Sequence, residues 1–263
     1  MNYYQIKTKY SKKIKKINPN WDLAFLSSTN SLNLKYLDGY FKEMQKDFSF
    51  KGELPSLKAF KANLNRNYKG LDKESWIFVI NNRQPIACLN YDLIAINKKL
   101  YCGLIIFIDV HRGYREHGLG HLLLRLLSEM IKSEVENRNA DLLGYFAEVN
   151  DPKKMSPKEL KADFKRSGIK TTERLLFWSK LGFKKLDFNY IQPSLGFGSV
   201  KYLSLIFKGS GLVKSLESPI IIRYLKEFTA FTISNKREAA RDEDLKTMAK
   251  ELRSKGEIKL IKI

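Results

Sequence analysis

Apolar residues recur at two different spacings along this chain, and the change of spacing marks the predicted elements. Residues 33–48 carry apolar side chains three or four positions apart, the spacing of one helix face: Leu34, Leu37, Phe41, Met44 and Phe48. Residues 56–68 have a similar pattern. We therefore predict two amphipathic helices in this part of the chain.

Strands are predicted next, because β-branched and aromatic residues dominate. Residues 75–96 contain two such runs separated by the polar turn NNRQ, which indicates a β-hairpin. Residues 100–110 form a continuous apolar run, as expected for a strand that is buried on both faces.

Helices and strands then alternate. We predict a helix from the end of the next glycine-containing loop to about residue 136, strands at 140–149 and 201–207, and helices at 157–166 and 171–183. The last fifty residues are polar and helical in pattern, apart from the apolar segment SPIIIRYLKEFTAF. Such alternation favours an α/β sheet with parallel pairing at its centre, and the hairpin adds an antiparallel part.

The charge balance is strongly basic, with 48 Lys and Arg against 28 Asp and Glu and a formal net charge of +20. Such a field favours anionic partners, among them nucleotides, nucleic acid, an acidic protein or a membrane surface. The lysines are spread over the whole length, so a coding bias of the source explains the charge as well. The basic stretch at 10–17 is interpreted as a solvated face.

The two cysteines, Cys88 and Cys102, do not make a disulfide framework, and Cys102 is interpreted as a small core residue rather than a nucleophile. The N-terminal segment is basic without the apolar core of a secretory signal, and no segment approaches the ~18 apolar residues of a membrane span. We therefore expect a reduced, cytoplasmic protein without a membrane span.

The segment DVHRGYREHGLGHLLLRLL, residues 109–127, places Gly118 and Gly120 between a predicted strand and a predicted helix. A helix N-terminus presents unpaired backbone N–H groups and the positive end of the helix dipole. Glycines remove side chains that would block a bulky anion, and they permit unusual φ values. Strand, glycine loop and helix together therefore predict an anion-binding site.

Two common phosphate-binding motifs do not fit this loop. A P-loop requires Gly-Lys-Ser/Thr, whereas Gly120 is followed by His-Leu. The dinucleotide fingerprint requires a third glycine, where this chain has leucine. The remaining pattern is Arg115-x-x-Gly118-x-Gly120, directly after a strand that ends in Val110.

That pattern resembles the coenzyme A loop of the GNAT superfamily of N-acyltransferases, whose typical form is Val-x-Pro-x-Tyr/Phe-Arg-Gly-x-Gly-hydrophobic-Gly. Arg112 replaces the frequent proline and Glu116 replaces a frequent glycine, and neither change should harm backbone N–H donation. The stretch FAEV is similar to the family's fifth strand. The stretch LLFWSKLGFKKLD is similar to its helix and strand of the form aromatic-x-x-hydrophobic-Gly-Phe.

The resemblance covers roughly residues 35–207 and implies a GNAT-like α/β (α+β) fold. In that fold a mixed, mostly antiparallel sheet with a central parallel pair is flanked by helices. We expect a single domain over residues 1–263, with its core at about 33–207 and a helical C-terminal extension at about 211–263.

The resemblance also implies coenzyme A, as acetyl-CoA, for the acyl donor. The pantetheine arm would lie beside the strand end, the pyrophosphate would lie on the loop's N–H groups, and a backbone N–H near Val110 would polarise the thioester carbonyl. The implied coenzyme-binding residues are Ile108, Val110, Arg115, Glu116, His117, Gly118, Leu119, Gly120 and His121. A primary amine would attack directly, without a covalent enzyme intermediate.

The amine must lose a proton before it attacks, which suits a carboxylate whose pKa is raised by burial. The resemblance places Glu148 at the position that often holds this base; the alternative is a glutamate that faces solvent or pairs with a Lys or Arg. Asp109 is the second candidate base, and its alternative is a turn-forming residue that caps the loop.

The departing thiolate should be protonated, which in many family members is done by a tyrosine on the fourth helix. The matching residue here is Trp178, whose indole N–H is not a useful acid. Tyr190 follows the next predicted strand and is the candidate substitute, with an ordinary half-buried tyrosine as its alternative.

Residues 150–170 form a longer connection than the family usually has, and we interpret them as a lid or wall on the acceptor side, with exposed decoration as the alternative. His111, His117 and His121 cluster around the glycine loop without an evident third metal ligand. We therefore predict no metal site, and assign these histidines to coenzyme phosphates or to simple exposure.

We expect an acetyl-CoA-dependent N-acetyltransferase that acts on a primary amine of a protein or a small molecule. The rivals are a catalytically weak or inactive GNAT-fold binding module and a basic nucleic-acid-binding protein. The nucleic-acid hypothesis rests on charge alone, because no helix-turn-helix or aromatic-interleaved basic motif is evident, so no specific nucleic acid is expected.

Overall fold

The fold is given by a computed structural model that describes residues 3–48, 54–65, 75–193, 200–233 and 241–263. The chain divides into two compact units. The first comprises Met1–Gln45 and Ser56–Leu142, and the second comprises Lys46–Pro55 and Leu143–Ile263. The single-domain organisation stays a prediction, and each unit is described by itself.

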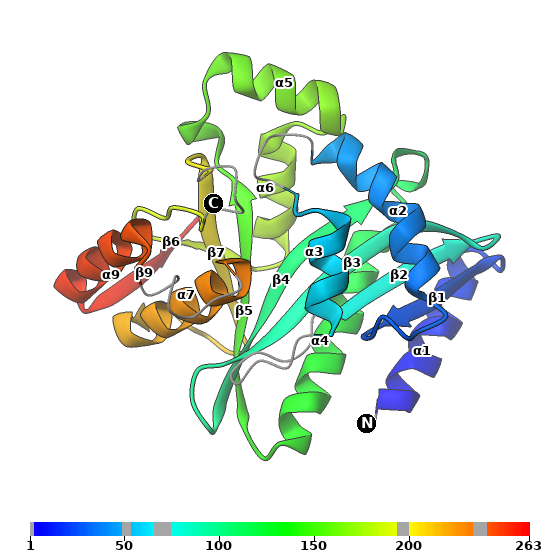
Figure 1. The fold of residues 1–263 in the computed structure, drawn as a ribbon, viewed down its shortest axis with the longest axis horizontal. Helices are drawn as coiled ribbons and strands as arrows, with labels where there is room; N and C mark the ends of the chain where they lie inside the picture. The colour runs from blue at the N-terminus through cyan, green and yellow to red at the C-terminus, as the bar shows by residue number, and fades with distance from the viewer. Residues whose placement is uncertain (1–2, 49–53, 66–74, 194–199, 234–240) are drawn as a thin grey trace. The chain divides into compact units, whose positions relative to one another are not determined.

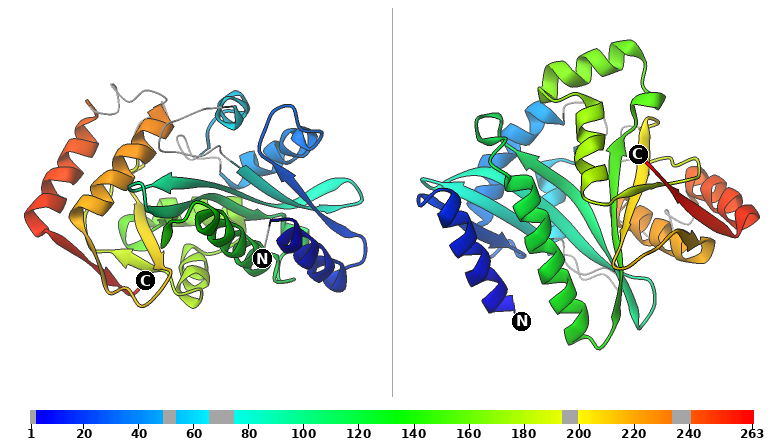
Figure 2. Two further views of the ribbon diagram at one scale, coloured as in Figure 1. Left: turned by 90° about the horizontal axis from the view of Figure 1, so that it is seen from below. Right: turned by 180° about the vertical axis from the view of Figure 1, so that it is seen from behind.

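The first unit is a four-stranded antiparallel sheet with helices on both faces (Figures 1 and 2). Its strands, in sheet order, are β1 (Trp21–Leu26), β2 (Ser75–Asn81), β3 (Gln84–Ala95) and β4 (Leu100–Val110). Its helices are α1 (Tyr3–Ile17), α2 (Leu34–Asp47), α3 (Leu57–Leu64), the short 3-10 helix η1 (Arg112–Tyr114) and α4 (Leu119–Asn137). The predicted hairpin is confirmed as β2 and β3.

Helices α1 and α4 lie on one face of this sheet, and α2 and α3 lie on the other (Figure 2). Helix α1 buries Ile6, Tyr10 and Ile14, one apolar position per turn. The interpretation of residues 10–17 as a solvated face is therefore wrong for Tyr10 and Ile14, although the four lysines of this stretch are exposed. On the other face, the ring of Phe60 lies 5.1 Å from Trp76, which anchors α3.

The second unit contains a five-stranded sheet in which each strand is antiparallel to its neighbour. Its strands, in sheet order, are β5 (Asp141–Asn150), β7 (Leu203–Gly209), β6 (Lys184–Leu186), β9 (Glu257–Ile261) and β8 (Ser215–Glu217). Its helices are η2 (Pro152–Lys154), α5 (Pro157–Ser167), α6 (Thr171–Lys180), α7 (Ser218–Ile233) and α9 (Glu243–Lys255). Helix α7 packs on β5 through Phe146 and Tyr224, whose rings stack 4.0 Å apart.

The mixed, mostly antiparallel α/β fold agrees with the prediction. The C-terminal extension differs from the prediction, because β8 and β9 accompany its helices. Both strands are short, so their sequence period is weak. The predicted helix at 56–68 ends at Leu64, and residues 66–68 lie outside the described residues.

Neither cysteine is in a disulfide, and both are buried. In the described part of the chain, no helix combines the length and the apolar character needed to cross a membrane.

Candidate functional site

Strand β4 delivers the glycine loop, and a β-bulge lies shortly before its end. Phe107 pairs with Asn90 and Ile105 pairs with Tyr91, so Ile106 is the extra residue of the bulge. A bulge of this kind bends the strand and redirects the residues that follow. The strand stays paired with β3 up to Val110, and the N–H of His111 donates to Ile86 O at 2.9 Å.

Between β4 and α4 the backbone turns through two left-handed residues. Glu116 has φ 69° and Gly118 has φ 73°, and Gly118 is the N-cap of α4. The guanidinium Nε of Arg115 donates to Val110 O at 2.8 Å, which ties the loop to the strand end. Most of the loop surface is exposed, including residues 116–118 and His121.

The N-terminus of α4 is open to a ligand. Apart from its chain neighbours, a Cβ placed on Gly118 would meet no described atom within 4 Å, so the position of a side chain at Gly118 is open. The first turn of a 19-residue helix supplies N–H groups and a positive dipole end. The loop can therefore hold an anion, as the sequence predicts.

An aromatic cluster supports the loop from β1, which sequence patterns did not predict. The ring of Trp21 lies 6.0 Å from Tyr114 and 5.6 Å from His117, with edge-to-face geometry in both cases. The Tyr114 hydroxyl also accepts a hydrogen bond from Asn81 Nδ2 at 3.0 Å. His117 therefore packs on Trp21, while its exposed surface stays at the loop.

Asp109 is buried next to the strand end. Its Oδ2 accepts a hydrogen bond from the hydroxyl of Tyr40 at 2.8 Å, and its Oδ1 lies 4.0 Å from an Arg115 nitrogen. These partners hold Asp109 within the sheet, a different arrangement from the turn-forming alternative. Tyr40, on α2, is a partner that only the tertiary fold reveals.

In the second unit, Glu148 and Tyr190 are in direct contact. The Tyr190 hydroxyl donates to Glu148 Oε1, and Gln192 Nε2 donates to Glu148 Oε2 at 3.1 Å. Glu148 is half-buried, whereas Tyr190 is buried. The sequence singled out the first two residues, but Gln192 lies in an irregular segment and carries no motif.

Burial dominates the electrostatics of this pair. It raises the pKa of Glu148 to about 7, although the hydrogen bonds from Tyr190 and Gln192 act in the opposite direction. Burial, followed by the negative charge of Glu148, raises the pKa of Tyr190 well above its ordinary value. A carboxyl group with a pKa near 7 exchanges protons readily at neutral pH, which is what a general base requires.

Trp178 is buried and its ring lies 4.8 Å from that of Phe183. The residue therefore packs in the core of the second unit. Among the described residues, no three His, Cys, Asp or Glu side chains are grouped so that they could hold a metal ion.

The long connection at 150–170 is ordered and docked on α6. Helix α5 begins with a capping box formed by Ser156 and Glu159. Asp163 is buried, accepts a hydrogen bond from Thr171 Oγ1 at 2.7 Å and pairs with Arg174. The connection thus forms a packed helix in the second unit; its role in acceptor binding stays a prediction.

The candidate residues fall into two groups. The coenzyme-binding candidates at 108–121 and Asp109 belong to the first unit, and Glu148 and Tyr190 belong to the second. Within each unit the structure brings the predicted residues together.

No protein-family model matches the chain, and a search of curated proteins gives no match. Solved structures with a similar fold include a Bacteroides thetaiotaomicron protein assigned to the GNAT family of acetyltransferases (17% identity, 66% of this chain and 82% of that chain, TM-score 0.42). Another is the ribosomal-protein-S18-alanine N-acetyltransferase of Escherichia coli, with 16% identity over 73% of this chain and 96% of that chain and a TM-score of 0.41. A third is Arabidopsis thaliana Naa50 with a bisubstrate analogue, with 12% identity over 72% of this chain and 99% of that chain and a TM-score of 0.42. The first two of these structures are described as acetyltransferases. At these identities and TM-scores, the likeness carries no information about activity.

Proposed function

We propose that this chain is an N-acetyltransferase that transfers an acetyl group from acetyl-CoA to a primary amine. The observation that carries the proposal is the exposed N-terminus of α4, opened by Glu116 and Gly118 directly after a strand that ends in Val110. Coenzyme A carries phosphates that suit such a helix N-terminus.

The residues of the first unit fit an elongated ligand with a pyrophosphate. The N–H groups of residues 116–121 would donate to the phosphate oxygens, and the backbone at Ile108 and Val110 would accompany the pantetheine arm. Arg115 Nε donates to Val110 O, so this side chain would act mainly by stabilising the conformation of the loop.

Glu148 is the proposed general base. The amine nitrogen would attack the thioester carbonyl carbon, its proton would pass to the Glu148 carboxylate, and the carbon–sulfur bond would break to release the thiolate. The pKa of about 7 supports this assignment, and Asp109 is the alternative base. Tyr190 would supply the proton that the thiolate takes up, and it would regain one from Glu148 through their hydrogen bond.

An inactive binding module is the second candidate, and the burial of Trp178 at the position of the family's usual acid favours it. The two candidates differ in turnover rather than in coenzyme binding. Thioester cleavage measured with a panel of primary amines separates them, because a binding module would bind acetyl-CoA and leave it intact.

The direct test of the proposal is the variant Gly118→Asp. The open space at Gly118 would accommodate the side chain, whose negative charge would then stand where phosphates are expected, while the left-handed backbone adds a cost of about 1 kcal/mol. We expect a folded protein that no longer binds acetyl-CoA in calorimetry. Gly118→Ala carries the same backbone cost without the charge and is the control. Wild-type affinity in the folded Asp variant would show that the loop is not the coenzyme site.

A further inference from the structure

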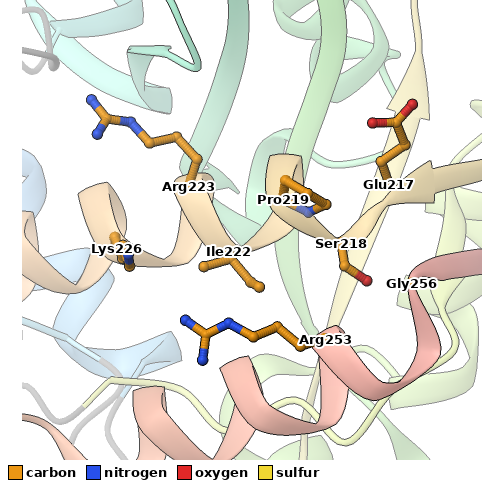
Figure 3. A pocket seen from close by; sticks show the side chains of 8 residues that line it. All are labelled: Glu217, Ser218, Pro219, Ile222, Arg223, Lys226, Arg253 and Gly256. Atoms are coloured by element: carbon orange, nitrogen blue, oxygen red, sulfur yellow. The ribbon is translucent and has the colours of Figure 1, made fainter.

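The second unit contains a pocket of about 630 Å³ in the C-terminal extension, and none of its lining residues belongs to the candidate site described above. It is lined by residues of β8, α7 and α9: Glu217, Ser218, Pro219, Ile222, Arg223, Lys226, Arg253 and Gly256 (Figure 3). The volume lies in the range of small-molecule sites, which is roughly 300–1,000 Å³.

The pocket is held together by hydrogen bonds across its base. The Ser218 hydroxyl donates to Leu252 O at 2.5 Å, and the Ser218 N–H donates to Gly256 O at 2.8 Å. These bonds fix the start of α7 to the end of α9, so the lining residues are presented from two helices locked to each other.

Positive charge dominates the lining. Three cations, Arg223, Lys226 and Arg253, stand against the single carboxylate of Glu217. Arg223 is partly neutralised, because it pairs with Glu227 at 2.8 Å. Lys226 and Arg253 form no ion pair with any residue that the structure describes.

Lys226 and Arg253 are exposed and share the pocket lining with the exposed Pro219 and with Ile222, of which 8% is exposed. In Figure 3, Arg253 extends into the space between α7 and α9, where the side chain of Ile222 also points, and Lys226 lies farther along α7. The carboxylate of Glu217 points away from that space. Along α7, Ile222 lies between Pro219 and Lys226 in this view.

We propose that this pocket binds a small organic anion, whose phosphate or carboxylate group meets Arg253 and Lys226 and whose apolar part lies on Ile222 and Pro219. The volume matches a ligand of small-molecule size, and charge-assisted hydrogen bonds to the two cations would supply the affinity. The site lies in the C-terminal extension and uses none of the residues assigned to acetyl transfer.

Calorimetry on the full chain tests the proposal with phenyl phosphate and phenylacetate as probes. Inorganic phosphate supplies the head group alone, and benzyl alcohol supplies the ring without charge. We expect one of the two aromatic anions to bind at one site per chain at least tenfold more tightly than either partial probe. The better of the two identifies the head group.

Substitutions then locate the site. Arg253→Gln and Lys226→Gln should each weaken the better probe about tenfold, a loss of about 1.4 kcal/mol. Lys250→Gln removes the same charge from an exposed position of α9 outside the pocket and should change affinity less than twofold. Gly118→Asp should leave probe binding unchanged, which separates this site from the coenzyme loop.

Several results would overturn the proposal. One is that neither aromatic anion binds, and another is that inorganic phosphate binds as tightly as phenyl phosphate. An equal loss of affinity in Arg253→Gln, Lys226→Gln and Lys250→Gln would have the same consequence. An acidic peptide or a duplex oligonucleotide that binds through Arg253 while both aromatic anions fail would assign the surface to a macromolecule instead.

Discussion

At the scale of single residues, Glu148 is a partly buried carboxylate that accepts hydrogen bonds from Tyr190 and Gln192. The donors stabilise its ionised form, and burial opposes them and dominates. Burial of the ionised carboxylate costs folding free energy, and groups with such shifted pKa values cluster at functional sites. Substitutions of Glu148 should therefore change both the turnover rate and the free energy of unfolding.

Glu148→Gln keeps the shape of the side chain and removes its basicity. We expect turnover to fall about 10²- to 10⁴-fold, the usual effect of losing a general base, while acetyl-CoA affinity stays the same. Steady-state rates with a saturating amine from pH 6 to 9, together with calorimetry, measure the two quantities. Unchanged turnover would transfer the role to Asp109 or to water.

The same residue should make stability depend on pH. Its pKa of about 7 lies above the unfolded value near 4.5, so between these values the folded chain binds more protons than the unfolded chain. Stability therefore falls as pH rises from about 4.5 to about 7, by at most about 3 kcal/mol because part of the side chain reaches solvent.

Urea unfolding of the wild type and of Glu148→Gln at pH 5 and pH 8 measures this effect. As pH rises, the free energy of unfolding of Glu148→Gln should increase relative to that of the wild type. Tyr190→Phe removes a donor to the carboxylate, which should raise the Glu148 pKa further and extend the fall in stability to higher pH. A gap between wild type and Glu148→Gln that is constant from pH 5 to 8 would contradict the assigned shift.

At the scale of elements, helix α5 depends on one buried carboxylate. Asp163 accepts from Thr171 and pairs with Arg174, and both partners belong to α6. These contacts therefore link the insertion directly to α6.

Asp163→Ala should destabilise the protein by about 3 kcal/mol, since it leaves the charge of Arg174 without this partner. The unfolding free energy measures the loss. Lys161→Ala, at an exposed site on the same helix, should stay within about 0.5 kcal/mol of the wild type. Equal effects of the two substitutions would show that Asp163 does not link the helices.

Elements with a strong sequence period are the ones that sequence patterns predict well. The β2–β3 hairpin, β4 and α4 each have a long apolar pattern, and the structure confirms them. Strands β8 and β9 are three and five residues long, too short to show a period. Helix α1 has buried residues at one position per turn, but the lysines between them make this pattern difficult to recognise in the sequence.

Site residues follow the same rule. Gly118 is a candidate because it stands between a patterned strand and a patterned helix, and Glu148 is a candidate because the family resemblance places it at the position of the base. Gln192, Tyr40 and Trp21 come from distant segments and are recruited by tertiary packing, which local sequence does not encode.

At the scale of the whole molecule, the net charge of +20 acts as a field over the surface. It should speed association with anions without selecting one. The proposed ligands of both units are anions, so both would gain from it.

Acetyl-CoA affinity should accordingly fall as salt rises from 50 to 500 mM, because salt screens the field around the phosphates. Calorimetry over this range measures the trend. Duplex DNA should bind weakly and without sequence preference. Tight, sequence-selective DNA binding at physiological salt would instead favour a nucleic-acid-binding protein.

The left-handed backbone at Glu116 bears on how long a ligand stays. A non-glycine residue in this conformation costs roughly 1 kcal/mol, and its carboxylate adds negative charge beside an anion site. The backbone cost is already present without ligand and belongs to folding. Under the proposed function, the negative charge of the Glu116 carboxylate weakens coenzyme binding and so shortens the residence time of the coenzyme. A loop with such a built-in penalty suits a ligand that must leave after each turnover, rather than a prosthetic group that is retained for the life of the protein.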